Sequence, residues 1–182
     1  MPAPAQIDRS DVLRASLAVA DRGGIQAVTM QRVADQLGVS PMGLYRHVDS
    51  KADLLDGLVE HLLSEVRLPP DDLPWERRLI AMGDSLRDTA HRHPAVFGLL
   101  LQRPAATPGS QRVRDTVYAA LDAAGLPADQ IPQAERLIST FVIGFCVSEV
   151  SGRFLGDQQH RDADFRRLQR SVLDALNRAV NP

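Results

Sequence analysis

The sequence has one cysteine, few aromatic residues and no long uninterrupted apolar run, and these shortages exclude several kinds of protein. A single cysteine, Cys146, cannot form an internal disulfide, which is typical of proteins in a reducing compartment. The longest apolar stretch, residues 138–150, is too short and contains too many polar residues to span a membrane. The first residues lack the charged and apolar segments of a signal peptide, so the sequence predicts a cytoplasmic protein without a membrane partner.

Sequence motifs of the common enzyme classes are also missing. There is no Gly-rich phosphate-binding loop, no Gly-x-Ser-x-Gly nucleophile motif and no His-Glu-x-x-His zinc motif. Cys146 lies in an apolar helical run, where a thiol is usually inert. His91 and His93 flank the expected end of a helix, but the neighbouring sequence offers no third and fourth ligand for a metal ion. We therefore predict no catalytic residue, no metal site and no cofactor.

The charge balance excludes a protein that binds nucleic acid through bulk positive charge. The net charge is −2, and residues 1–67 carry seven basic side chains against nine acidic ones. Any affinity for DNA must then come from a few well-placed groups together with contacts to the bases. All 21 basic residues except Lys51 are arginine, and this lysine directly follows the most informative segment of the chain. Chance survival of one lysine in an arginine-biased composition explains it equally well.

Residues 28–55 predict two short helices joined by a tight turn and followed by the start of a third helix. Gly38 is suited to the left-handed conformation that ends a helix, and Ser40 is suited to cap the next one. Pro41 fits the first turn of that next helix, because its missing N–H loses no hydrogen bond there. This arrangement is typical of the helix-turn-helix motif, whose second helix enters the DNA major groove.

The apolar periodicity predicts an all-α protein, with a three-helix headpiece joined by a linking helix to a helical-bundle C-terminal domain. We place a DNA-binding domain at 1–50 and a second, helical domain at 51–182, linked by a helix at 51–66. Ser50 is expected to cap this linking helix, with Asp53 as its partner in a capping box. The other expected helices are 9–22, 30–37, 41–47, 74–92, 94–102, 109–124, 129–155 and 162–180.

The headpiece resembles the DNA-binding signature of the TetR family of transcriptional regulators over about residues 8–60. The residues that carry the resemblance are Thr29, Val33, Ala34, Leu37, Gly38, Val39, Ser40, Leu44, Tyr45, His47, Val48, Ser50, Lys51 and Leu54. Val48 stands where most of the family has phenylalanine, and the His47-Val48 pair resembles the tetracycline-repressor branch. Beyond residue 67 the resemblance is architectural: helices broken by proline that end in two long ones.

The resemblance implies that the second helix of the motif meets bases and the adjacent backbone, while its flanks meet phosphate. The implied DNA contacts are Thr29, Gln31, Ser40, Pro41, Met42, Gly43, Tyr45, Arg46, His47 and Lys51. Gly43 is unusual, since glycine costs about 1 kcal/mol relative to alanine inside a helix. Either a neighbour or DNA approaches it closely, or the position is tolerant. Tyr45 also has a second interpretation, as an aromatic residue packed at the edge of the core.

The expected helix at 129–155 carries one face of small residues and one face of bulky ones. The TetR family forms dimers through its last two long helices, so the resemblance assigns the small face and the final helix to a homodimer interface. The expected interface residues are Gly144, Ser148, Gly152, Phe165, Leu168, Val172 and Leu176. Packing of the same helices within one chain is the alternative.

The bulky face is then expected to line the interior, where the family holds a small molecule. The expected pocket residues are Met82, Leu86, Phe97, Leu101, Tyr118, Thr140, Phe141, Phe145 and Glu149. A core without a ligand fits the same residues. Glu149 also has a second interpretation, as an ordinary surface ion pair with Arg153.

The sequence therefore predicts a ligand-responsive transcriptional repressor that binds a palindromic double-stranded DNA operator as a homodimer and is released by a small-molecule effector. The alternative is a helical protein-interaction module that has lost DNA binding, which the acidic balance of the N-terminal part favours. An enzyme that works in the bundle cavity is a third hypothesis, and the lack of a nucleophile–base pair argues against it.

Overall fold

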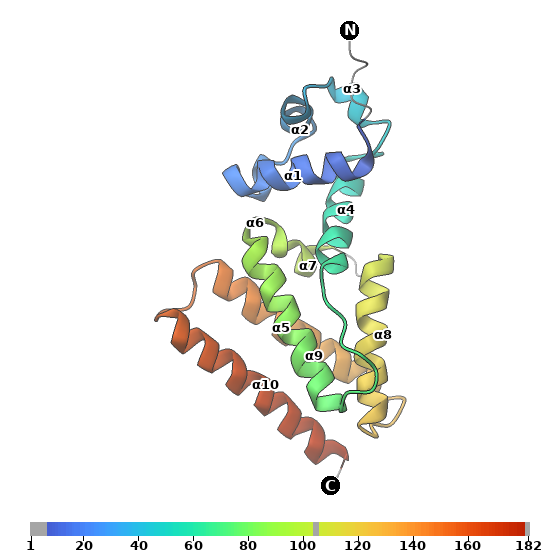
Figure 1. Cartoon of the computed structure of the whole chain (residues 1–182), viewed down its shortest axis with the longest axis vertical. Coiled ribbons are helices and arrows are strands. Elements are labelled where there is room, and N and C mark those ends of the chain that lie inside the picture. The colour runs from blue at the N-terminus through green and yellow to red at the C-terminus, as the bar shows by residue number, and fades with distance from the viewer. Residues whose placement is uncertain (1–6, 104–105, 181–182) are drawn as a thin grey trace.

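The computed structural model describes residues 7–103 and 106–180, and every regular element in these ranges is helical. The elements are α1 (Arg9–Gly23), a short 3-10 turn (Ile25–Ala27), α2 (Met30–Leu37), α3 (Pro41–Leu44), α4 (Lys51–Ser64), α5 (Trp75–Arg92), α6 (Pro94–Phe97), α7 (Leu99–Gln102), α8 (Pro108–Ala123), α9 (Ile131–Val150) and α10 (Gln158–Val180). Helices α1–α3 form a small headpiece at one end, and α4 leads from it into a larger body made of α5–α10 (Figure 1). The all-α prediction is confirmed.

The headpiece helices begin and end where short-range polar contacts fix them. Asp8 Oδ1 accepts from the backbone N–H of Asp11 at 2.8 Å, and Asp11 Oδ2 accepts from that of Asp8 at 2.9 Å, which makes a reciprocal capping box for α1. Thr29 and Ser40 cap α2 and α3 through their hydroxyl oxygens. Gly38 ends α2 with a φ of 68°, a conformation that costs a glycine nothing. The core beneath these helices consists of Val12, Val33, Ala34, Leu44 and Val48.

Several helix boundaries differ from those expected. Helix α3 ends at Leu44, because the carbonyl of Leu44 accepts from both His47 N and Val48 N and the chain continues as a turn. The expected helix 94–102 is divided at Gly98 into α6 and α7. Helix α9 ends at Val150, and Gly152 lies in the following turn with a φ of 74°. The start of the last helix was expected at residue 162, but it lies at Gln158.

Helix α4 is the structural link between headpiece and body. Its leucines at 54, 58 and 62 are fully buried and belong to a core cluster that runs without interruption from α1 to α6 and α9. The carboxylate of Asp56 accepts from Arg103 Nε at 2.7 Å, and Glu60 accepts from the backbone N–H of Gly109 at 2.8 Å. Helix α4 is therefore tied to the body at several points along its length.

The body packs α5, α8 and α9 against one another, and α10 runs along one outer side (Figure 1). A second apolar cluster lies at the end of the body far from the headpiece, where α5, α8, α9 and α10 meet. Its buried members are Leu79, Met82, Val117, Ala120, Leu121, Leu126, Ile131 and Leu176. Across the described ranges, no helix has both the length and the apolar character that a membrane crossing requires.

Candidate nucleic-acid interface

The outer end of the headpiece presents α3 and the turn after it. Leu44 is completely buried and fixes α3 to the headpiece core, whereas Met42 is 75% exposed and Tyr45 is 48% exposed. Met42 in α3 and Tyr45 directly after it therefore leave apolar surface that is accessible to a partner. Helix α3 lies at the end of the headpiece far from the body (Figure 1), and no described residue buries these two side chains.

The polar residues around α3 are partly committed to local hydrogen bonds. The hydroxyl of Ser40 accepts from the backbone N–H of Gly43 at 3.2 Å, so it serves as the cap of α3. Gln31 Nε2 donates to Asp35 at 2.7 Å and must leave this bond, or share it, to meet a base. Thr29 is exposed and caps α2 through a 3.2 Å bond from the N–H of Arg32.

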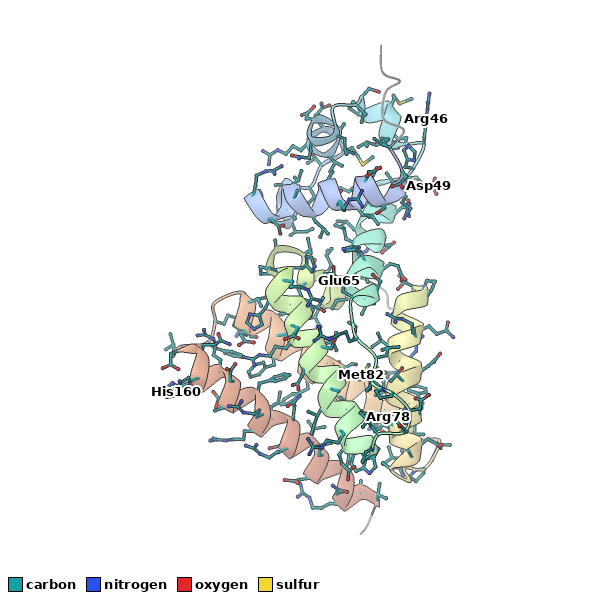
Figure 2. All side chains as sticks on the ribbon, in the orientation of Figure 1. Arg46, Asp49, Glu65, Arg78, Met82 and His160 are labelled. Atoms are coloured by element: carbon teal, nitrogen blue, oxygen red, sulfur yellow. The ribbon has the colours of Figure 1, made fainter. Side chains whose placement is uncertain are left out.

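Three basic side chains follow α3 in the chain, and none of them forms an ion pair with another described residue. Arg46 and Lys51 are exposed and His47 is half-buried. Arg46 lies on the outer side of the headpiece, and Asp49 follows it on the way to α4 (Figure 2). Because the net charge of the protein is −2, any affinity for DNA must come from a few well-placed cations such as these three.

Gly43 has no crowded neighbour inside the protein. A Cβ atom built at this position would lie 3.6 Å from Ser40 Oγ and 3.7 Å from Val39 Cβ, which are ordinary contacts. Of the explanations considered from the sequence, close approach by a neighbour within the chain is therefore wrong. Close approach by DNA and simple tolerance remain.

Arg9 is a positioning residue that the sequence analysis missed. Its Nη1 donates to the carbonyl of His47 at 2.8 Å, and its Nη2 donates to Asp53 Oδ1 at 2.7 Å, which joins α1 to the turn after α3 and to α4. The hydrogen bond from Arg9 holds the pKa of Asp53 below its ordinary value. The expected capping box at Ser50 is half correct. Ser50 Oγ accepts from Asp53 N at 3.1 Å, but the Asp53 carboxylate accepts from Arg9 and from Asp49 N.

The body contains a cavity of about 450 Å³ between α4, α5, α8 and α9. The predicted pocket residues that line it are Met82, Leu86, Leu101, Tyr118 and Thr140. Val59 and Leu63 of α4 also line it, so the linking helix forms one wall. A volume of this size and a mostly apolar wall with a few polar groups are typical of a small-molecule site.

Four other residues predicted for the pocket lie elsewhere, which corrects the expectation for them. Phe97 is fully buried in the core, and Phe145 packs against Phe154 and Phe165 with ring centroids 4.8 and 5.2 Å away. Phe141 is 50% exposed and lies in a groove on the outside of α9 and α10. The sequence predicted Phe141 and Phe145 on one inward face of α9. The structure separates them, because α9 has body helices on more than one side.

Glu149, the fourth of these residues, is the centre of a buried ion-pair network and not a free polar anchor. Its side chain is 2% exposed, and Arg87 Nε donates to it at 2.7 Å. His91 Nε2 lies 3.2 Å from the same carboxylate, and Arg87 also donates to Asp162 of α10 at 2.7 Å. Burial acts to raise the pKa of Glu149, but the hydrogen bond and charge of Arg87 outweigh it, so the pKa is lowered. The alternative of a surface pair with Arg153 is wrong, because Glu149 joins α5, α9 and α10.

The residues predicted for a dimer interface divide into two groups. Phe165 is 1% exposed and packs within its own chain, so it cannot offer its side chain to a partner, which corrects that expectation. Leu176 is 9% exposed but lines the groove on the outside of α9 and α10. Gly144 borders open space, since a Cβ atom built there would meet nothing within 4 Å. Ser148, Leu168 and Val172 are half-buried, and Gly152 is exposed in the turn beyond α9.

Two family models match the chain and together cover most of it. Residues 12–58 match bacterial regulatory proteins of the tetR family, and residues 68–181 match the tetracyclin repressor-like C-terminal domain. An HTH-type transcriptional regulator of Saccharopolyspora erythraea is 32% identical over 158 residues, which are 86% of this chain and 67% of that protein. The transcriptional repressor DrrR1 of Streptomyces coeruleorubidus is 28% identical over 171 residues, 91% of this chain and 62% of that protein. The chain thus spans about two thirds of the length of these relatives.

Solved structures of the same fold cover nearly the whole chain. BioQ, in a structure with its double-stranded DNA operator, is 28% identical with a TM-score of 0.81, and the match covers 94% of this chain and 99% of BioQ. ActR of Streptomyces coelicolor, in complex with actinorhodin, has a TM-score of 0.84 at 20% identity, over 94% of this chain and 96% of ActR, and it supports the fold alone. The family consists of regulators and not of enzymes, which confirms the expectation of a non-enzymatic protein. Both parts of the sequence and the fold lead to one conclusion: the chain belongs to the TetR family of DNA-binding transcriptional regulators.

Proposed function

We propose that the protein is a ligand-responsive repressor that binds a palindromic operator as a homodimer. In this proposal residues 1–50 recognise DNA, residues 51–182 hold the effector and the dimer interface, and α4 transmits the signal. Its DNA contacts are the ten residues named above from Thr29 to Lys51. The single observation that carries the proposal is the outward position of α3, with Met42 and Tyr45 exposed on a buried Leu44.

The outer face of α9 and α10 supports the homodimer. Leu137 and Phe141 are exposed there, beside a groove that is also lined by Val172, Ala175 and Ala179. Exposed apolar side chains at such a groove lose contact with water when a second copy packs against them. Ser148, Leu168 and Gly144 extend this surface along the same two helices, and the open space at Gly144 allows a partner helix to approach closely.

The cavity beside α4 supports a small-molecule effector. Arg103 lines this cavity and also holds α4 through Asp56 and the carbonyl of Ala52, at 2.7 and 3.2 Å. A ligand that displaces Arg103, or that favours one position of Val59 and Leu63, changes the direction of α4. Such a ligand lowers operator affinity only if it binds the two positions of α4 with different affinity. BioQ with its operator and ActR with actinorhodin are relatives in fold that hold each kind of partner.

A footprint and a gel shift on the DNA that flanks the protein's own gene test the proposal. We expect protection with two-fold symmetry over two half-sites whose centres lie about one helical turn, or about 34–36 Å, apart. Binding to unrelated DNA with equal affinity, or no binding by a folded protein, favours the interaction-module alternative. A compound that fits the cavity should release the operator from the wild type and not from a Met82→Trp variant, whose larger side chain fills the same space.

A further inference from the structure

Three metal-ligating side chains converge where α4 meets the junction of α5 and α6. His61 Nε2 lies 3.2 Å from Glu65 Oε1, and His93 Nε2 lies 3.0 Å from the same oxygen. One nitrogen or oxygen atom from each side chain lies within 4.8 Å of the others. Glu65 is near the end of α4 that faces the body (Figure 2). The sequence analysis considered His93 with His91 and found no further ligand nearby, but the fold supplies two ligands from α4.

The geometry is close to what a tetrahedral metal ion requires. His61 and Glu65 are four residues apart on one helix, so they share a face, and His93 approaches from the second element. With bonds of about 2.0–2.1 Å, a tetrahedral ion holds its ligand atoms about 3.3–3.4 Å apart. The two distances to Glu65 Oε1 need to lengthen only by a few tenths of an ångström. The ligand atoms of the two histidines lie within 4.8 Å of each other, so closing the site also requires an adjustment of these side chains. The three side chains are part-buried, which leaves a fourth position open to water.

The ligand types select the class of ion. Two imidazole nitrogens and one carboxylate oxygen suit Zn²⁺ and its neighbours among the transition metals. Mg²⁺ and Ca²⁺ prefer ligand sets made entirely of oxygen, so they are poor occupants. Both histidines face the carboxylate with Nε2, which is the ligand atom that each offers to the ion.

Arg92 is the positive group that this site must accommodate. Its Nη2 lies 2.8 Å from Glu65 Oε2 and its Nε lies 3.0 Å from the same atom, so it holds the oxygen that does not face His61. Oε1 therefore remains available to an ion while Arg92 orients the carboxylate, as the hydrogen-bonded partners of metal ligands commonly do.

We propose that His61, Glu65 and His93 bind one divalent transition-metal ion of the Zn²⁺ type, which ties the linking helix to the α5–α6 junction. Two ligands belong to α4 and one to the body, so the ion fixes the position of the helix that carries the headpiece. This inference does not require that the protein binds DNA, and it is tested on the full chain without DNA.

Zinc titration of the metal-free, tag-free protein by calorimetry tests the site, with excess Mg²⁺ present throughout. We expect one Zn²⁺ per chain. The His61→Gln, His93→Gln and Glu65→Gln variants should bind at least about tenfold more weakly, since even loss of a residue that only orients a ligand costs 10- to 100-fold. His160→Gln is the matched control, because His160 is exposed, pairs with Asp157 and lies far from the cluster in Figure 2.

Two further measurements keep the result independent of how well the variants fold. Circular dichroism reports whether each variant retains its helices. Anomalous scattering from zinc-soaked crystals of the wild type locates the ion without any substitution, and hydrogen exchange should slow at residues 61–66 when zinc is added. No zinc uptake by the wild type, equal uptake by the His61 and His93 variants, or an anomalous peak elsewhere overturns the proposal.

Discussion

The headpiece and the body treat their polar side chains differently. Around α3, Met42, Tyr45 and Arg46 are exposed. The start of the helix is fixed by the hydroxyl of Ser40, which accepts from the backbone N–H of Gly43. In the body, Arg87 and Glu149 are removed from water and paired with each other across helices. The side chains of α3 therefore remain available to a partner, while charged side chains of the body hold α5, α9 and α10 in place.

The largest expected effect is the loss of Glu149. Glu149→Ala leaves Arg87 without its main partner in a buried position, and we expect the free energy of unfolding to fall by about 3 kcal/mol. This is the lower end of the usual range, because Arg87 keeps its hydrogen bond with Asp162. Chemical denaturation measures the change. Arg67→Ala is the control, since it breaks an exposed pair with Asp88 and should cost about 1 kcal/mol or less. Equal stability of both variants contradicts the account of the body.

The same carboxylate predicts how stability depends on pH. The pKa of Glu149 is lowered in the folded protein, so its ionised form stabilises the fold at a pH above the ordinary value of 4.5. That contribution is lost as the pH falls below 4.5 through the lowered pKa. We expect the wild type to lose more stability than Glu149→Gln over this acidic range. If the free energy of unfolding of the wild type and of Glu149→Gln falls in parallel with pH, this argues against the ion pair.

Substitutions of exposed headpiece residues should weaken operator binding and leave the free energy of unfolding unchanged, in contrast to the loss of Glu149. Tyr45→Ala should weaken operator binding by about 1–3 kcal/mol, the range for loss of a base contact, with little change in melting temperature. Lys51→Ala should weaken binding to every sequence alike and reduce the slope of affinity against salt by about one phosphate contact. Fluorescence anisotropy at several salt concentrations separates the two effects. Leu155→Ala, which also removes an exposed apolar side chain, should bind as the wild type does.

Arg9 lies between these two cases, because it joins elements but is partly exposed. Arg9→Ala should destabilise the protein by about 1 kcal/mol or less, since solvent screens the pair with Asp53. It should also lower operator affinity, because the turn at His47 loses one of its supports. Arg14→Ala is the control, as its exposed pair with Asp11 stays within α1. If Arg9→Ala unfolds the protein, Arg9 is needed for the fold itself and does not merely hold the turn at His47 in place.

The smallest expected effect is at Gly43. Gly43→Ala should raise the free energy of unfolding by up to about 0.5 kcal/mol, because alanine favours the helix and meets only ordinary contacts. We expect operator affinity to fall in the same variant, since a Cβ atom stands where DNA approaches. Unchanged affinity shows that the position is merely tolerant.

The sequence predicts interactions between residues that are close together in the chain better than interactions between residues that are far apart. The caps at Ser40 and Ser50 act over three residues, so the local sequence predicts them. Arg9 meets Asp53 over a separation of 44 residues, and nothing in either local pattern indicates the pairing.

The body was harder to predict for the same reason. Glu149 and Phe141 lie on one helix, yet one is buried and the other is exposed, because helices remote in sequence cover only part of α9. The convergence of His61 and Glu65 with His93 also depends on the packing of α4 against the α5–α6 junction. Side-chain periodicity tells which residues share a face and not which neighbour covers it.

The most direct test of the central claim is a footprint of the wild type and of a Met42→Ala, Tyr45→Ala double variant on the same flanking DNA. The account predicts two symmetric protected half-sites for the wild type and loss of both for the double variant, while its melting temperature stays the same. Protection by the folded double variant at wild-type concentration contradicts the claim that α3 reads the DNA.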